Sequence, residues 1–423
     1  MYILTLNCRR FSVQYQLFDW EQKQVLARGS VERVVVGDSF ITHKVPGRGV
    51  QHREHECPDH HAAVELILAT LADGKIGVID SSCLITAIGH RVAHGGEKFT
   101  SSVLIDAEVL AAVHEMEQLA PLHNTPNMAG IRAALELLPD IPHVAIFDTA
   151  FHQTMPPAAY IYPLPYEWYE KYGVRRYGFH GQSHFYASKR AAALLGKPSD
   201  QCSLITVHTG NGVSLCAIKN GISIDTSMGL TPLEGVMMGT RCGDIDPGIL
   251  PYMMQETNIS PRDLDLVLNQ KSGVIGITGR HTSRRSALEE AIVGDHRCRT
   301  ALDMEAYRLK KYIGSYSAVA GPLDAIVFAY GEGWADWPVR GLALQGMEAF
   351  GIRLDAERDR RALAGSGEML VSSDDSSVRV FVIPTDEERV FVEDVAAILA
   401  GLNAGPTRYD YSFARSAGEP VIR

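Results

Sequence analysis

The sequence predicts an α/β fold with mixed sheets, and two observations support this prediction. Short apolar segments typical of strands alternate along the chain with segments of helical spacing. In addition, residues 2–17 and residues 203–218 each read as two strands joined by a tight turn. One hairpin at the start of each half indicates a duplicated domain.

The expected elements follow from local patterns. Residues 11–17 alternate apolar and polar side chains as a half-buried strand does, and residues 7–10 form the turn before them. The expected strands cover residues 2–7, 11–17, 85–91, 143–147, 203–208, 213–218, 221–225, 325–329 and 378–384. The expected helices cover residues 59–72, 106–119, 126–137, 182–195, 249–256, 262–269, 287–293, 298–319 and 388–402.

Composition limits the protein class. A chain of 423 residues is too long for one ordinary domain, so two or three domains are expected. A content of 46% hydrophobic and 21% charged residues fits a soluble globular protein with substantial cores. The net charge of -10, without a basic block, argues against nucleic acid and membranes as partners. No apolar run approaches the roughly 18 residues of a membrane span.

The cysteines indicate a reducing compartment. Seven of them are scattered along the chain, and none forms a C-x-x-C pair. Such thiols read as free, and as neither a disulfide frame nor a zinc site. The sequence therefore predicts a cytoplasmic protein.

Asp148 directly follows the apolar strand at residues 143–147. Open α/β sheets place binding and catalytic groups at this end of a buried strand. Pro156 and Pro157 then end regular structure. The alternative is that Asp148 only caps the following turn.

Other polar runs follow expected strands, at residues 89–96, 122–124, 178–181, 208–212 and 238–247. Arg91 and Arg241 lie in Gly-rich turns and suit bidentate recognition of a carboxylate or phosphoryl group. The Gly-rich turn at residues 208–212 can present N–H groups to phosphates. His123 alone reads as a packed core histidine. Together the runs suit phosphoryl transfer to or from a small acid.

In their order along residues 1–402, these motifs resemble the acetokinase family of the sugar kinase, Hsp70 and actin superfamily. The resemblance implies two duplicated RNase-H-like (actin-like ATPase) domains facing a central cleft. The first domain is expected at 1–150 plus 387–423. The second, at 151–386, is expected to hold the nucleotide site and the interface of a homodimer. The implied reaction is reversible phosphoryl transfer from ATP to acetate, giving ADP and acetyl phosphate.

The resemblance also implies roles for single residues. Arg91 and Arg241 hold the carboxylate and the phosphoryl group, while His180, with His123 nearby, stabilises transition-state charge. Asp148 is the essential acid. The acetate pocket comprises Ala93, Leu122, Phe179 and Pro232. The metal, Mg²⁺ or Mn²⁺, is surrounded by Asn7, Asp148 and Glu387. The nucleotide is bound by Ser12, Gln14, His208, Thr209, Gly210, Asn211, Gly212, Ser283, Arg285, Gly331 and Gly333.

The sequence departs from the family pattern on the donor side. The family's first hairpin carries a Gly, serines and a Lys, where this chain has Arg9, Arg10 and Gln14. Losing one charge-assisted bond of about 1.5–3 kcal/mol weakens phosphate binding roughly tenfold to hundredfold. Ser283 replaces an Asp expected beside the nucleoside, and Trp334 could stack on a base or fill its pocket.

Three interpretations remain open: an ATP-dependent acetate kinase with rearranged donor contacts, an acyl kinase using another donor such as pyrophosphate, and a non-catalytic paralogue. A sugar kinase or Hsp70-like ATPase is a different class, against which the Arg91, Asp148, His180 and Arg241 motifs argue. In the acetate pocket, Ala93 replaces a Val and removes two methyl groups. We expect propionate to be accepted as well, unless the change is without consequence.

Overall fold

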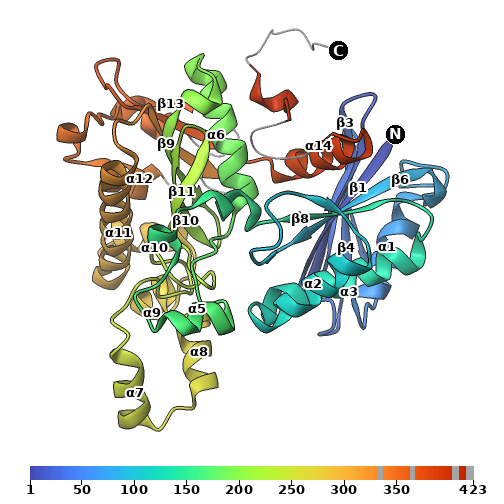
Figure 1. Ribbon diagram of the computed structural model, residues 1–423, viewed down its shortest axis with the longest axis horizontal. Coiled ribbons are helices and arrows are strands. Elements are labelled where there is room, and N and C mark those ends of the chain that lie inside the picture. Colours follow the sequence, from blue (N-terminus) through green and yellow to red (C-terminus); the bar gives the residue numbers. More distant parts are fainter. Residues whose placement is uncertain (332–336, 363–366, 403–408, 416–423) are drawn as a thin grey trace. The chain divides into compact units, whose positions relative to one another are not determined.

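The computed structural model describes residues 1–331, 337–362, 367–402 and 409–415 (Figure 1). The chain divides into two compact units. Unit 1 comprises Met1–Gln153 and Glu387–Ser412, and unit 2 comprises Thr154–Asp386 with the residues from Phe413 on. No helix in the described residues has the length and apolar composition needed to cross a membrane.

Unit 1 is an eight-stranded sheet covered by helices. Its strands are β1 (Tyr2–Arg9), β2 (Ser12–Asp19), β3 (Gln24–Glu32), β4 (Phe40–Val45), β5 (Gly49–Glu54), β6 (Ile85–Val92), β7 (Val103–Leu104) and β8 (His143–Phe147). Its α-helices are α1 (His60–Leu71), α2 (Ala107–Glu115), α3 (Pro121–Leu137) and α14 (Glu387–Leu399). Within this unit, α14 covers one side of the sheet and α1–α3 the other (Figure 1).

Unit 2 is a six-stranded sheet with more helices around it. Its strands are β9 (Ser203–Thr209), β10 (Val213–Lys219), β11 (Ile222–Thr226), β12 (Ala325–Tyr330), β13 (Met369–Leu370) and β14 (Arg379–Pro384). Its α-helices are α4 (Pro157–Tyr160), α5 (Tyr166–Tyr172), α6 (Gly181–Leu195), α7 (Ile249–Thr257), α8 (Pro261–Gln270), α9 (Gly273–Thr278), α10 (Arg284–Ile292), α11 (His296–Ala320), α12 (Trp337–Leu344) and α13 (Ala356–Arg361). Short 3₁₀ turns cover Ser82–Leu84, Met116–Gln118, Ala150–Thr154, Ser199–Gln201, Glu348–Phe350 and Ser412–Ala414.

The two sheets share one strand plan. Unit 1 has the order β5-β4-β3-β2-β1-β6-β8-β7, and unit 2 has the order β11-β10-β9-β12-β14-β13. In each, an antiparallel hairpin (β1–β2 or β9–β10) leads into two parallel neighbours (β6 and β8, or β12 and β14). A short antiparallel strand, β7 or β13, closes the far edge. The predicted duplication is therefore confirmed.

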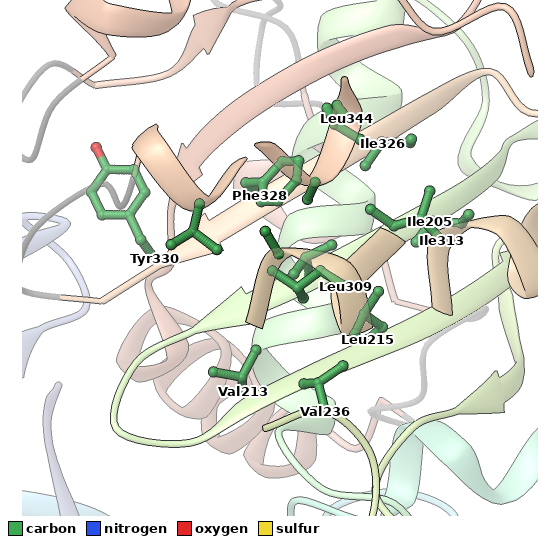
Figure 2. Close-up of a cluster of buried hydrophobic side chains, with 14 of the residues drawn as sticks. Ile205, Val213, Leu215, Val236, Leu309, Ile313, Ile326, Phe328, Tyr330 and Leu344 are labelled. Atoms are coloured by element: carbon green, nitrogen blue, oxygen red, sulfur yellow. The ribbon is translucent and has the colours of Figure 1, made fainter. Parts of the chain in front are cut away.

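The core of unit 2 lies between its sheet and the long helix α11 (Figure 2). Leu309 and Ile313 on α11 pack with Ile205, Leu215 and Ile326 from the strands, and all are at most 2% exposed. The Asp295 carboxylate accepts from the Cys298 N–H, which fixes the start of α11. A single apolar stripe of α11 thus anchors the sheet that carries the polar turn at residues 209–212.

Several sequence expectations need correction. Strands β3, β4 and β5 were not predicted; every residue of β5 is exposed, so no apolar alternation marks it. Helix α3 begins at Pro121 and contains Pro126 in its interior, so residues 122–124 lie in a helix and not in a loop. Asn7 lies within β1 and not in the turn.

The expected extent of the first domain, 1–150 plus 387–423, also differs from the observed units. Tyr411 and Ser412 bond to α14 of unit 1, through Asp394 and Glu393. From Phe413 the chain belongs to unit 2, where Arg190 donates to the carbonyl oxygen of Phe413 at 2.5 Å. The last described residues are therefore not part of the first unit.

Candidate active site

In unit 1, Arg91 and Asp148 meet at the ends of two parallel strands. The register of β6 and β8 places Arg91 opposite Ile146, so Asp148 follows on the neighbouring strand. Arg91 Nε donates to Asp148 Oδ1 at 3.0 Å, and Arg91 Nη2 donates to Oδ2. Asp148 is 1% exposed, and this burial raises the pKa of its carboxyl against the opposing effect of the Arg91 cation.

Asn7 joins this pair from β1. Arg91 Nη1 donates to Asn7 Oδ1 at 3.2 Å, and Asn7 Nδ2 donates to Gln14 Oε1 at 3.3 Å. Asn7 and Gln14 face each other across the hairpin. Gln14 therefore orients the Asn7 amide from the position where the related pattern has a Lys.

Glu387 begins α14 close to the same pair. Burial, followed by the negative charge of Asp148, raises the pKa of the Glu387 carboxyl to about 7. The described residues contain no group of three His, Cys, Asp or Glu side chains placed to hold an ion. Two neighbouring carboxylates and an amide are nevertheless hard oxygen donors, and Mg²⁺ usually takes only one or two carboxylates beside water and substrate oxygens. The donor chemistry therefore fits Mg²⁺.

Helix α3 fixes the loop that follows Arg91. Asn124 accepts from the His94 N–H at 3.0 Å and donates to the His94 carbonyl at 2.9 Å. Asn127 accepts from the Ala93 N–H at 2.9 Å and donates to the Cys8 carbonyl at 2.6 Å. Both amides are buried. The sequence did not indicate that the two amides hold this loop, because the residues they bond lie far from them along the chain.

The residues expected to line the acetate pocket have different surroundings. Ala93 is buried in unit 1, while Leu122 at the start of α3 is 44% exposed. His123 next to it is half-buried, not a packed core histidine. In unit 2, Phe179 is 3% exposed and belongs to the hydrophobic core, and the Pro232 carbonyl accepts from Arg241.

In unit 2, Gly212 brings His180 and Arg241 together. A Cβ atom added at Gly212 would lie 3.0 Å from His180 Cε1 and 3.2 Å from Arg241 Nη1. Glycine at this position lets both side chains approach the turn this closely. Arg241 donates to the Pro232 carbonyl at 3.3 Å, no described carboxylate pairs with it, and burial lowers the pKa of its guanidinium. An incompletely paired buried cation suits an anionic substrate group.

His180 precedes α6 with a left-handed φ of 57°, and its ring stacks on that of His208 at 4.1 Å between centroids. Ser214 lies 2.8 Å from His180 Nδ1, and Ser183 lies 2.7 Å from His208 Nδ1. Two expected site histidines thus form one stack, held by serines that the sequence analysis did not single out.

A small hollow of about 10 Å³ lies beside Thr209 at the end of β9. Its lining consists of Thr209, Arg284, Glu305, Leu309, Phe328, Tyr330, Val339 and Arg340. Arg284 donates to Glu305 at 2.5 Å and to the Gly210 carbonyl at 3.3 Å. Arg285, the expected nucleotide ligand, lies on the surface, where it pairs with Glu289.

The other expected nucleotide residues come from several separate segments of the chain. Ser283 precedes α10, Asn211 is exposed in the turn, and Gly331 follows β12. Gly333, Glu332 and Trp334 lie outside the described residues. Ser12 begins β2 in unit 1.

Comparison with known proteins decides the family. The family model described as "Acetokinase family" matches residues 2–393. The chain is 62% identical over 416 residues to acetate kinase of Geobacter sulfurreducens, covering 98% of this chain and 99% of the relative. The chain belongs to the acetokinase family.

Solved structures of the acetokinase family agree with this assignment. Acetate kinase of Porphyromonas gingivalis superposes with a TM-score of 0.89 at 44% identity, covering 94% of this chain and 99% of that one. A propionate kinase of Francisella tularensis superposes with a TM-score of 0.86 at 35% identity, covering 93% and 99%. The expected duplicated actin-like ATPase fold is thereby confirmed.

The structure places the first departure from the acetokinase pattern at the tip of the β1–β2 hairpin. Arg9 and Arg10 are both exposed there, and Arg9 ends β1 on the same strand face as Asn7. Although the Arg9 side chain is exposed overall, the protein atoms around its guanidinium and the nearby Arg91 cation lower its pKa, whereas Glu387 and Asp148 raise it. The hairpin therefore presents positive charge near the Arg91–Asp148 pair, in place of a glycine.

Proposed function

We propose that the chain transfers a phosphoryl group reversibly between ATP and acetate, producing ADP and acetyl phosphate. The observation that carries this proposal is the close approach of Arg241 and His180 to Gly212 in unit 2. Unit 1 supplies the Arg91–Asp148 pair. Membership of the acetokinase family supports the same reaction.

The reaction needs charge stabilisation more than proton transfer. An acetate carboxylate oxygen attacks the γ-phosphorus, a new P–O bond forms, and the bond to the ADP oxygen breaks with its electron pair. No proton is exchanged between acetate and ATP in this step. Cationic and N–H groups therefore suffice, as is general for phosphoryl transfer.

We assign the groups by their chemistry. Arg241 and His180 donate to oxygens of the moving phosphoryl group, and Arg91 contributes a second guanidinium for the acetate side. The turn from His208 to Gly212 receives the nucleotide phosphates. Ala93, Leu122, Phe179 and Pro232 line the methyl end of the acid.

Mg²⁺ is the proposed metal, held by Asp148, Glu387 and Asn7. When bound, it would neutralise charge on the phosphate oxygens. Burial, followed by the negative charge of Asp148, raises the pKa of Glu387 to about 7, and a bound divalent cation would offset the repulsion between the two carboxylates. Protein oxygens alone do not complete an octahedral shell, so water and substrate oxygens would supply the rest.

We further propose a cytoplasmic homodimer assembled through unit 2. The described cysteines are all free, which fits a reducing compartment. Helices α7 and α8 expose Ile249, Tyr252 and Leu266 in this unit. Sedimentation equilibrium would show a mass of twice 46.3 kDa if the proposal holds, and a monomer would refute it.

A second candidate is an acyl kinase that uses pyrophosphate. It is favoured by one observation, the charged and bulky Arg9 and Arg10 at the hairpin tip. The test is acetyl phosphate formation by the purified full chain with acetate, Mg²⁺ and either ATP or pyrophosphate. Turnover with ATP supports the proposal, turnover with pyrophosphate alone supports the second candidate, and none with either in a folded sample refutes both.

A further inference from the structure

Four side chains of unit 2 form a chain of hydrogen bonds that ends on His180. Thr206 Oγ1 lies 2.7 Å from His184 Nδ1, His184 Nε2 lies 2.8 Å from Ser214 Oγ, and Ser214 Oγ lies 2.8 Å from His180 Nδ1. We name these four residues the histidine relay. The first three are 0% exposed, so their protons must find acceptors within the protein.

Thr206 sets the direction in which the relay donates. Within the described chain its hydroxyl bonds only to His184 Nδ1. Leaving a buried hydroxyl proton without an acceptor is costly, so Thr206 donates and His184 Nδ1 accepts. The neutral His184 ring then carries its proton on Nε2 and donates it to Ser214. The Ser214 hydroxyl in turn donates to Nδ1 of His180.

We infer that the histidine relay holds His180 in the neutral tautomer with its proton on Nε2. A Cβ atom at Gly212 would lie 3.2 Å from both His180 Nε2 and Arg241 Nη1, so both nitrogens lie close to Gly212. The Nε2–H group is then a donor beside the Arg241 guanidinium. The opposite tautomer would present a lone pair there and repel a phosphoryl oxygen. This inference rests on the proposed function, in which Arg241 and His180 donate to the phosphoryl group.

A second chain of hydrogen bonds gives His208 the same tautomer. Thr385 Oγ1 donates to Ser183 Oγ at 3.0 Å, which leaves the Ser183 proton for His208 Nδ1 at 2.7 Å. His208 therefore carries its proton on Nε2, and a Cβ atom at Gly210 would lie 3.3 Å from that nitrogen. Both stacked rings thus direct Nε2–H groups toward the glycine turn. The residues that hydrogen-bond to the two rings are positioning residues, since these residues touch no substrate.

The tautomer can be measured without any turnover. The full chain is labelled with ¹⁵N-histidine, and the His180 ring signals are identified by their loss in His180→Gln. At neutral pH we expect a protonated Nε2 and an unprotonated Nδ1. A proton on Nδ1 overturns the inference. Because the spectrum is independent of catalysis, an inactive protein would refute the proposed function without deciding this point.

A substitution at the far end of the relay tests its direction. In Thr206→Asp, a carboxylate can only accept from His184 Nδ1, so every bond in the relay reverses and the His180 proton moves to Nδ1. We expect kcat to fall about hundredfold, as when an oxyanion donor is lost, with both KM values nearly unchanged. Thr206→Ser keeps the hydroxyl and should restore the parent spectrum and kcat.

Two further variants keep the test decisive. If Thr206→Asp does not fold, Ser214→Ala breaks the relay at its last link and should lower kcat and allow His180 to exchange between tautomers. Thr226→Val is the matched control, because it removes an equally buried hydroxyl that bonds to the Leu215 carbonyl at 3.0 Å. An unchanged His180 spectrum and kcat in Thr206→Asp or Ser214→Ala overturns the inference.

Discussion

Arg91 donates two hydrogen bonds to the Asp148 carboxylate in a fork, whereas no described carboxylate pairs with Arg241. The fork occupies one edge of the Arg91 guanidinium, and Asn7 accepts from its remaining nitrogen at 3.2 Å. Arg91 is therefore fixed in position by its own unit. Arg241 keeps N–H groups for an anion. The fold of unit 1 therefore depends on Arg91 as the partner of Asp148, whereas no described carboxylate depends on Arg241.

This contrast predicts stability effects of different size for two alanine substitutions. Arg91→Ala leaves the buried Asp148 carboxylate unpaired, so the free energy of unfolding should fall by about 3–5 kcal/mol. Arg241→Ala is the matched control. It leaves no carboxylate unpaired and should change the free energy of unfolding by about 1 kcal/mol or less. Both should abolish most kinase activity. Urea unfolding measures the first effect, and equal stabilities of the two variants would contradict the different roles.

The amide of Asn124 should be needed to hold the loop after Arg91. Asn124→Ala removes both side-chain bonds to the buried backbone of His94. We expect a loss of about 2–4 kcal/mol in the free energy of unfolding and a higher KM for acetate. Thr125→Ala is the control, since its exposed hydroxyl bonds to Glu117 at 2.9 Å. If both variants behave like the parent, the clamp has no such role.

Asp394 should make the stability of the parent protein fall as pH rises. Burial raises the pKa of this carboxyl to about 6 from an ordinary 3.8. The folded state therefore holds the proton more tightly than the unfolded state, and this contribution is lost as pH rises through about 6. The shift corresponds to about 3 kcal/mol.

Asp394→Asn isolates this effect, because an amide keeps an acceptor for the Ser102 or Tyr411 hydroxyl without taking a charge. The free energy of unfolding of the variant, minus that of the parent, should increase between pH 4 and pH 7 by up to about 3 kcal/mol. Urea titrations at several pH values give this difference. A difference that does not change with pH would rule out the raised pKa.

Ala93 should make room for propionate. Adding two methyl groups in Ala93→Val should disfavour propionate relative to acetate about fourfold, since one buried methylene contributes about 0.8 kcal/mol. The measurement is the ratio of kcat/KM for the two acids. Urea unfolding of the variant checks that the loop held by Asn127 remains intact. An unchanged ratio would mean that Ala93 does not border the alkyl end of the acid.

The sequence predicted the parts of the fold that depend on local pattern. The hairpins β1–β2 and β9–β10 and the fully buried strand β8 have clear apolar patterns, and Asp148 follows such a strand. Strand β5 has no buried residue, so its pattern gives no signal. The start of α3 was misplaced because Pro126 looks like a helix start, although Pro121 already occupies that position.

The supporting residues of the site could not be predicted from sequence. Asn124 reaches His94 across 30 positions, and His184 reaches Ser214 across another 30. Such contacts depend on how strands and helices pack, which the local pattern does not encode. The family resemblance supplied Arg91, His180 and Arg241 as site residues but not the groups that orient them.

The central claim is phosphoryl exchange between acetyl phosphate and ADP. The most direct measurement is ATP formation by the purified full chain from these two substrates with Mg²⁺, followed by luciferase. The account predicts one ATP for each acetyl phosphate consumed, and almost none in Asp148→Asn or His180→Gln. Hydrolysis of acetyl phosphate without ATP formation, or no consumption by a folded protein, would contradict it.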